Sequence, residues 1–188
     1  MKLLLHTCCG PCLIYPYTFL KKQGFETTAY FYNPNIHPFR EFKRRLTSLQ
    51  DLSSLDKIPL AVENSYGFTD FARKVVFNEE KRCSLCYGMR LEKTLNYATK
   101  NGFTAFSTTL LYSKYQNHSL IIERCNHFSL EFGIDFIYFD FRKGWQRGID
   151  ESLKKELYRQ PYCGCIYSEQ ERYDKSLRKN KPSTSKNK

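Results

Sequence analysis

Short strand-like stretches alternate with longer helix-like stretches along this chain, and this alternation constrains the fold more than any other feature of the sequence. Runs of aliphatic, β-branched or aromatic residues predict strands at 3–6, 27–32, 59–63, 104–110 and 135–141. Helical spacing of apolar residues predicts helices at 12–23, 39–55, 68–77, 84–100, 115–132 and 149–159. Strands separated by helices of this length form a mainly parallel sheet that helices cover on both faces. The sequence therefore predicts a three-layer α/β domain.

Length and charge divide the chain into one domain and a basic tail. With 188 residues, 41% of them hydrophobic, and no internal repeat or interdomain linker, the chain fits a single globular domain over 1–174. The stretch 175–188 is polar, carries six Lys or Arg and no acid, and is predicted to be a disordered arm. This arm supplies six of the formal net charge of +11. A basic arm favours polyanions such as nucleic acid, although solubility alone would also explain it.

Cysteine is the residue that carries most of the chemical information in the sequence. Seven of the eight cysteines fall into three clusters, which are Cys8, Cys9 and Cys12, then Cys83 and Cys86, then Cys163 and Cys165. The N-terminal apolar run is three residues long, too short for a signal-peptide core or a membrane span, so we expect a cytoplasmic protein without membrane association. In a reducing compartment, close-set thiols indicate metal or redox chemistry more often than disulfides. The clusters therefore predict a metal centre.

The first cluster directly follows the first predicted strand, at the carboxyl end where open α/β sheets build their sites. Neighbouring side chains on an extended strand point in opposite directions, so Cys8 and Cys9 are expected to serve two metal centres rather than to chelate one ion. A [4Fe–4S] cluster takes four thiolates, which leaves three for a single metal ion with open coordination positions. Cys125 has core-like spacing and is interpreted as a buried hydrophobe. His6 is interpreted as a core histidine or a ligand, and His37 as a turn or substrate-facing residue.

Several longer motifs occur in order along the chain and together resemble one known family. They are H-T-C-C-G-P-C at 6–12, F-Y-N-P-N-I at 31–36, R-C-S-L-C-Y at 82–87, F-S-T-T-L-L at 106–111, F-R-K-G at 141–144 and Y-R-Q-P-Y-C-G-C-I-Y-S at 158–168. This set is similar to the signatures of the QueH family, the cobalamin-independent epoxyqueuosine reductases. The resemblance runs from residue 6 to residue 168 and so covers nearly all of the chain except the basic tail.

The resemblance implies a fold, a reaction and a cofactor. The fold would be similar to the Rossmann-like domains of the HUP superfamily, with a C-terminal metal-binding segment. The reaction would be the two-electron deoxygenation of epoxyqueuosine to queuosine at the tRNA wobble position, with an external low-potential electron donor. The cofactor would be a [4Fe–4S] cluster beside a mononuclear iron. The cluster ligands are then expected to be Cys83 and Cys86 with one residue of each pair Cys8/Cys9 and Cys163/Cys165, and the iron ligands the remaining thiols with Cys12.

Candidate contacts to tRNA lie in two regions. Phosphate contacts are predicted for Arg142, Lys143, Arg147 and the basic tail, and stacking on a base is predicted for Trp145 or Tyr32. The ordinary roles of such residues are a solvated charge and a core aromatic, which stay open as alternatives.

The substrate pocket and the proton donor are less closely defined by the sequence. Ser107 and Thr108 end a predicted strand, and their hydroxyls either line the substrate pocket or cap the following turn. The reaction also needs a proton donor, for which Tyr162, Tyr87 and a metal-bound water are candidates.

Two other functions stay open on the sequence alone. One is an ATP-using tRNA-modifying enzyme of the HUP fold, which would need a phosphate loop where this chain has thiols. The other is a tRNA-binding module with structural zinc, but seven clustered thiols fit one closed, four-coordinate zinc site poorly. The reductase is therefore the favoured interpretation.

Overall fold

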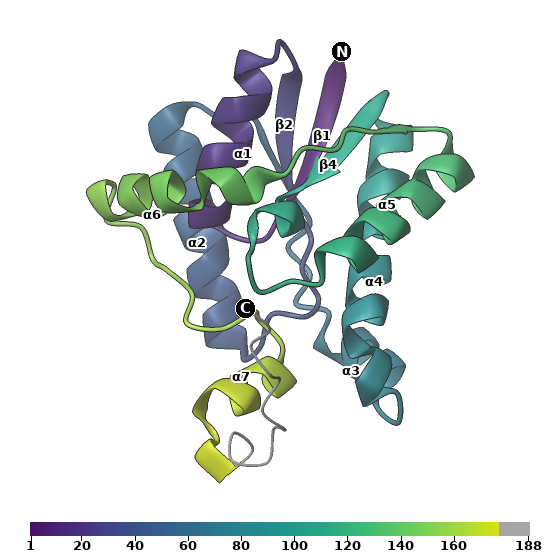
Figure 1. The fold of residues 1–188 in the computed structure, drawn as a ribbon, viewed down its shortest axis with the longest axis vertical. Helices are drawn as coiled ribbons and strands as arrows, with labels where there is room; N and C mark the ends of the chain where they lie inside the picture. Colours follow the sequence, from purple (N-terminus) through teal and green to yellow (C-terminus); the bar gives the residue numbers. More distant parts are fainter. Residues whose placement is uncertain (177–188) are drawn as a thin grey trace, which may run out of the picture.

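A sheet of five parallel strands forms the centre of the molecule in a computed structural model of the chain (Figure 1). The structure describes residues 1–176, so most of the predicted basic tail, 177–188, lies outside it. The strands are β1 (Lys2–Thr7), β2 (Glu26–Phe31), β3 (Leu60–Val62), β4 (Ala105–Thr108) and β5 (Asp135–Phe136), in the spatial order β3-β2-β1-β4-β5. Every neighbouring pair is parallel. The five predicted strands and their parallel arrangement are confirmed.

Helices cover both faces of this sheet and complete the three layers (Figure 1). One face carries α1 (Gly10–Lys22), α2 (Phe39–Asp56) and α6 (Trp145–Lys154), and the other carries α4 (Arg82–Lys100) and α5 (His118–Phe132), with α3 (Phe68–Val75) packed against α4. Short 3₁₀ turns connect these elements at η1 (Glu79–Lys81), η2 (Thr109–Tyr112) and η3 (Phe141–Gly144). A last helix, α7 (Ile166–Tyr173), was not predicted and lies beyond the carboxyl ends of the strands. The predicted α/β fold class is confirmed.

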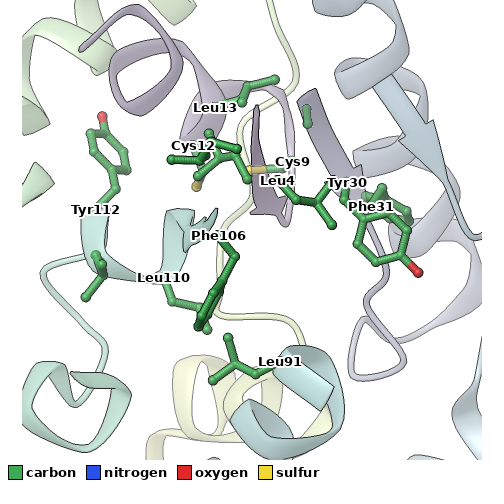
Figure 2. Packing of buried hydrophobic residues seen from close by; sticks show 14 of the residues in the cluster. Leu4, Cys9, Cys12, Leu13, Tyr30, Phe31, Leu91, Phe106, Leu110 and Tyr112 are labelled. Carbon is green, nitrogen blue, oxygen red and sulfur yellow. The ribbon is translucent and has the colours of Figure 1, made fainter. Parts of the chain in front are cut away.

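Strand β1 forms the middle of the hydrophobic core. Its residues Leu3, Leu4 and Leu5 are fully buried, because β1 has a parallel strand on each side and helices on both faces. Figure 2 shows Leu4 between Leu13 of α1 and Phe106 of β4. Burial of each such side chain stabilises the fold by about 1.5–3 kcal/mol. This strand is therefore a rigid support for the residues that follow it.

Two predicted strands end earlier than the sequence indicated. β4 ends at Thr108 rather than at residue 110, because the Thr108 side chain accepts a hydrogen bond from the Leu110 N–H and caps η2. β5 ends at Phe136 rather than at residue 141, and the ring of Phe139 packs edge-on against Phe19 of α1 at 4.9 Å. The aromatic residues after β5 therefore lead the chain across to the α1 face instead of extending the edge strand.

Helix α6 is shifted toward the N-terminus from its predicted position at 149–159. A Cβ at Gly144 would lie 2.2 Å from the Tyr15 ring, and one at Gly148 would lie 2.1 Å from the Tyr112 hydroxyl. The two glycines thus let the helix backbone approach these rings closely, which seats α6 on α1 and η2.

The strand order reverses at β1, which has β2 on one side and β4 on the other. Open α/β sheets form a crevice at such a point, beyond the carboxyl ends of the strands. The segments that leave β1 and β4 at this edge begin with Cys8 and Thr109. Among the described residues, no helix has the length and apolar character needed to cross a membrane.

Candidate metal centre

Three thiols meet where β1 passes into α1, and we refer to Cys8, Cys9 and Cys12 as the thiol trio. Their Sγ atoms all lie within 4.8 Å of one another. The chain bends after Thr7, so Cys8 and Cys9 are no longer on the strand, and their Sγ atoms are 3.9 Å apart. The two side chains therefore do not point apart as on an extended strand, and the assignment of each to a separate metal centre stays a prediction. Helix α1 begins at Gly10, and its first turn brings Cys12 back to the same place.

The thiol trio concentrates negative charge on Cys8. Hydrogen bonds with Cys12 and Cys9 hold the pKa of Cys8 well below its usual value, and the nearby charges of Arg90 and Arg45 lower it further. Burial is the main cause that raises the pKa of Cys9, and the hydrogen bond with Cys8 is the main cause that raises the pKa of Cys12. Of the three, Cys8 is therefore the thiol whose charged form the surroundings favour most, and Arg90 and Arg45 contribute to this.

The other four clustered thiols form a second group, the outer quartet, made of Cys83, Cys86, Cys163 and Cys165. The first two lie on α4, and Cys165 is the N-cap residue of α7. Burial raises the pKa of Cys86 to about 12, and the charges of Cys163 and Cys165 contribute to this shift. Burial is the main cause that raises the pKa of Cys83, and the charges of Cys163 and Cys165 raise it further. The four sulfurs are therefore close enough for their charges to act on one another, although they come from distant parts of the chain.

The chain returns to the thiol trio through residues 158–165, which we name the return segment. The Gln160 amide bridges two members of the trio: its Oε1 lies 3.1 Å from Cys9 Sγ, and its Nε2 lies 3.2 Å from Cys12 Sγ. The fully buried Arg45 of α2 donates to the backbone carbonyls of Cys163 at 2.8 Å and Tyr162 at 3.0 Å. These contacts bring the third cysteine cluster to the carboxyl edge of the sheet.

The return segment also docks on the loop after β2. The His37 N–H donates to the Gly164 carbonyl at 2.8 Å, and the Tyr162 hydroxyl donates to the His37 carbonyl. Gly164 has φ +151, and a Cβ there would lie 2.9 Å from the Asn35 side chain. His37 is buried, and its Nε2 lies 3.0 Å from the Pro34 carbonyl. The turn interpretation of His37 is therefore favoured over the substrate-facing one.

Arg90 lies between the thiol trio and the outer quartet. Its Nη1 is 3.9 Å from Cys86 Sγ, and its Nε donates to Nε2 of His6 at 3.3 Å. His6 is fully buried, and burial, with the charge of Arg90, lowers its pKa to about 3. The His6 Nδ1 lies 2.9 Å from the Thr108 hydroxyl. His6 is thus a neutral, hydrogen-bonded core histidine that helps to hold Arg90.

The predicted substrate-contact residues are scattered rather than gathered at the thiols. Ser107 and Thr108 are fully buried. The Thr108 side chain caps η2, which favours a role in capping the following turn over a role in lining the substrate pocket. Tyr32 is half-buried and lines a hollow of about 280 Å³ beside α3 and α4. Arg142 pairs with Asp140 at 2.7 Å.

Three other residues singled out in the sequence lie as follows. Lys143 is exposed, and Trp145 stacks on Tyr112 with ring centroids 5.2 Å apart. Cys125 of α5 is fully buried in the hydrophobic core, as its spacing predicted.

Four polar residues of the centre were missed in the sequence, namely Arg45, Arg90, Gln116 and Gln160. Gln116 donates to Cys163 Sγ at 3.0 Å and accepts from the Tyr87 hydroxyl at 2.7 Å. The spacing along a helix could have indicated two of the four residues, because residues four positions apart lie on the same helix face. Arg45 follows Glu41 by four residues, and Arg90 follows Cys86 by four. The two glutamines had no such signal.

The donor set fits iron. Thiolates are the usual protein ligands of iron–sulfur clusters, and N–H donors to the sulfurs together with burial tune such centres. Here, seven thiols gather at one edge of the sheet, and side-chain N–H groups of Gln160, Gln116 and Arg90 point at three of the sulfurs. The site can therefore hold metal at the trio and has a polar frame suited to an anionic centre.

Known proteins are similar to this chain over most of its length. Residues 3–171 match the family described as epoxyqueuosine reductase QueH. A protein of Dehalococcoides mccartyi named epoxyqueuosine reductase QueH is 40% identical over 93% of this chain and 96% of the relative. Relatives with the same name are 38% identical in Haemophilus influenzae, over 89% of this chain and 71% of the relative, and 33% identical in Thermotoga maritima, over 92% of both chains.

Among solved structures, the chain resembles one described as a predicted subunit of tRNA methyltransferase from Methanocaldococcus jannaschii. The TM-score is 0.56 at 10% sequence identity, over 81% of this chain and 74% of the other. At this identity the likeness shows only the fold, which is of the Rossmann-like kind.

Proposed function

The chain belongs to the epoxyqueuosine reductase QueH family, and on that premise we propose how its thiol centre removes the epoxide oxygen of epoxyqueuosine in tRNA. The enzyme is an epoxyqueuosine reductase, an oxidoreductase of queuosine biosynthesis. Two electrons and two protons convert the epoxide to the alkene of queuosine and one water. The observation that supports this function most directly is the meeting of Cys8, Cys9 and Cys12 at the strand-order reversal.

We propose that the outer quartet holds a [4Fe–4S] cluster and that the thiol trio holds a mononuclear iron. Four thiolates are the number that a [4Fe–4S] cluster takes, and three leave open positions on a single ion. This division is supported by the trio sulfurs lying within 4.8 Å of one another and by the charges of Cys163 and Cys165 acting on both Cys83 and Cys86. When bound, this centre supplies electrons one at a time.

The residues around the thiols then bind, orient and balance charge. Arg90 lies between the two groups of sulfurs, and Arg45 acts on the trio, so both offset the negative charge of the thiolates. Gln160 and Gln116 orient sulfurs by donating N–H groups to Cys12 and Cys163.

The candidate proton donors differ in their surroundings. The Tyr162 hydroxyl donates to a backbone carbonyl, which favours a structural role. The Tyr87 hydroxyl donates to Gln116, which in turn donates to Sγ of the exposed Cys163, so a chain of hydrogen bonds joins this hydroxyl to the thiol. We propose Tyr87 as the group that supplies a proton on this side of the centre.

The test is to reconstitute the full chain with iron and sulfide without oxygen and to incubate it with tRNA that contains epoxyqueuosine and a low-potential reductant. Nucleoside mass spectrometry is expected to show the loss of one oxygen atom. Cys86→Ser is expected to lose this activity and the brown colour, while the core control Cys125→Ser keeps both. A colourless protein with zinc as its only metal, inactive on this tRNA, would contradict the proposal and favour a structural-zinc module.

Two wider aspects of the function belong to the same proposal. An external low-potential donor supplies the electrons, because the residues described include no other redox group than the thiols. The cytoplasm is the compartment in which we expect the enzyme to act, since tRNA is its substrate.

A further inference from the structure

The loop between η2 and α5 borders the thiol centre at both of its ends, and we name residues 113–117 the rim loop. At one end, Figure 2 shows Tyr112 beside Cys12, and the charges of Cys12 and Cys9 contribute to the raised pKa of Tyr112 after burial. At the other end, Gln116 Nε2 lies 3.0 Å from Sγ of the exposed Cys163. Side chains between these two positions therefore lie next to the opening of the centre.

A row of stacked aromatic rings leads from the interior to the rim loop. Tyr15 of α1 stacks on Tyr112 at 6.5 Å, and Tyr112 stacks on Trp145 at 5.2 Å. The Tyr112 hydroxyl also donates to the Trp145 carbonyl at 2.9 Å. Figure 2 shows Tyr112 on the segment that faces Cys12. The absence of a side chain at Gly148 leaves room for the Tyr112 hydroxyl. The inner rings are thus fixed by packing and hydrogen bonding.

The outermost ring of this row is uncovered. Tyr115 is 85% exposed, and its ring meets Trp145 edge-on at 5.8 Å and 77°. Tyr and Trp are enriched at interfaces, because they combine a large apolar ring with a polar group. The charges around it are mainly positive: the Lys114 ammonium lies 5.7 Å from the Trp145 ring, and Arg159 acts on Tyr112. The acid of this neighbourhood, Asp150, is bound by Gln146 at 2.8 Å.

An aromatic surface with a cationic edge has the composition that recognises unpaired RNA. Bases without a pairing partner stack on Tyr and Trp rings, and Lys or Arg beside them contacts the phosphates. A base on which an enzyme acts must leave the stack of its loop, and its neighbour then loses a stacking partner. A ring at the mouth of the reaction centre replaces that partner.

We propose that Tyr115 and Trp145 form a stacking platform for the unpaired base next to the reacting nucleotide, with Lys114 at the adjoining phosphate. This inference rests on the proposed function, because it assumes that an RNA loop presents the substrate to the thiol centre. It makes Tyr115 a positioning residue that acts on substrate binding rather than on the chemical step.

The proposal is tested by binding and kinetics of the full, iron-loaded protein with an anticodon stem-loop. Tyr115→Ala is expected to raise the Kd for an unmodified stem-loop by about 5- to 100-fold, since one base–aromatic stack has that effect on binding. Tyr115→Phe keeps the ring and is expected to bind like the wild type. Leu130→Ala removes an equally exposed apolar side chain of α5, 88% exposed, and is the matched control. The KM for tRNA with epoxyqueuosine is expected to rise with the Kd while kcat and iron content stay unchanged.

A second substrate variant separates stacking from a general loss of affinity. We expect the wild type to bind a stem-loop with an abasic site beside the wobble nucleotide more weakly than the intact stem-loop. We expect the Kd of Tyr115→Ala to be no higher for the abasic stem-loop than for the intact one. Equal Kd values for the wild type and Tyr115→Ala on the intact loop would overturn the platform. Failure of the wild type to reduce epoxyqueuosine would overturn the proposed function instead, and the binding comparison would still decide whether the platform holds RNA.

Discussion

The buried Arg45 of α2 offers a way to separate the folding of this protein from the loading of its metal centre. Its guanidinium donates to the carbonyls of Tyr162 and Cys163 and pairs with Glu41 at 2.7 Å. The Tyr158 hydroxyl also donates to Glu41 at 2.5 Å. One side chain therefore connects α2 to the segment that carries two of the seven clustered thiols. We consider the substitution Arg45→Met, which keeps an unbranched apolar stem but removes the guanidinium with its charge and its donors.

The expected cost follows from these contacts. Removal of one partner of a buried ion pair leaves the other charge unpaired and typically costs about 3–5 kcal/mol. This is a large part of the free energy of unfolding of an ordinary domain, about 5–15 kcal/mol. The double variant Glu41→Gln with Arg45→Met no longer buries an unpaired carboxylate, so we expect it to be more stable than Arg45→Met alone. The carbonyls of the return segment still lose their donors in the double variant.

Two measurements distinguish the two effects. Urea unfolding is expected to rank the wild type above the double variant, and the double variant above Arg45→Met. Iron content after reconstitution, and hydrogen-exchange protection of residues 158–165, are expected to fall in both variants and to stay near the wild type in Glu41→Gln. Full iron content and wild-type protection in Arg45→Met would refute the argument that this arginine positions the return segment.

Three further predictions concern other parts of the centre. Cys86→Ser is expected to lose the absorbance of a loaded cluster in a visible spectrum, whereas Cys125→Ser keeps it. Cys125→Ser is expected to lower the free energy of unfolding by about 1–3 kcal/mol, because it places a hydroxyl in an apolar core. Equal spectra of the two variants would contradict the ligand assignment. Gly164→Ala places a Cβ 2.9 Å from the Asn35 side chain at φ +151, so we expect less iron bound per chain than in the wild type, and unchanged iron content would refute this. Gln160→Leu removes an N–H donor from Cys12 Sγ and is expected to lower the midpoint potential by about 40 mV in a redox titration, since a hydrogen bond of about 1 kcal/mol corresponds to that shift for one electron; a higher potential would exclude this role.

The sequence predicted the sheet well because each strand carries its own local signal. The run around Leu4 is apolar whichever helix covers it, and the helices on either side have regular apolar spacing. The ends of the elements were predicted less well, because they depend on contacts across the fold. β5 stops early since Phe139 finds Phe19 on α1, which lies 120 positions away in the sequence.

The candidate centre shows the same division. The spacing of the cysteines indicated a metal centre, since thiols that share an ion must lie within a few residues of one another or on converging elements. The contacts that bring the elements together had no local pattern: Arg45 meets the carbonyl of a residue 118 positions away, and Gln160 meets thiols 151 and 148 positions away. The position of Cys8 beside Cys9 was also missed, because the bend after Thr7 is set by how the chain leaves the sheet rather than by those two residues.

The location of the thiol trio explains why cysteines occupy a turn that holds phosphates in many folds of this kind. The N-terminus of α1 points free N–H groups and the positive end of its dipole at the crevice beside β1. That environment stabilises negative charge whatever atom carries it, and it lowers the pKa of thiols as well as attracting phosphate. In this chain Cys8, the thiol of the trio whose pKa is lowered, directly precedes Cys9, the N-cap residue of α1. A helix terminus that binds an external anion in other Rossmann-like proteins can thus stabilise the chain's own thiolates, and the crevice is left open for a substrate that arrives as part of an RNA.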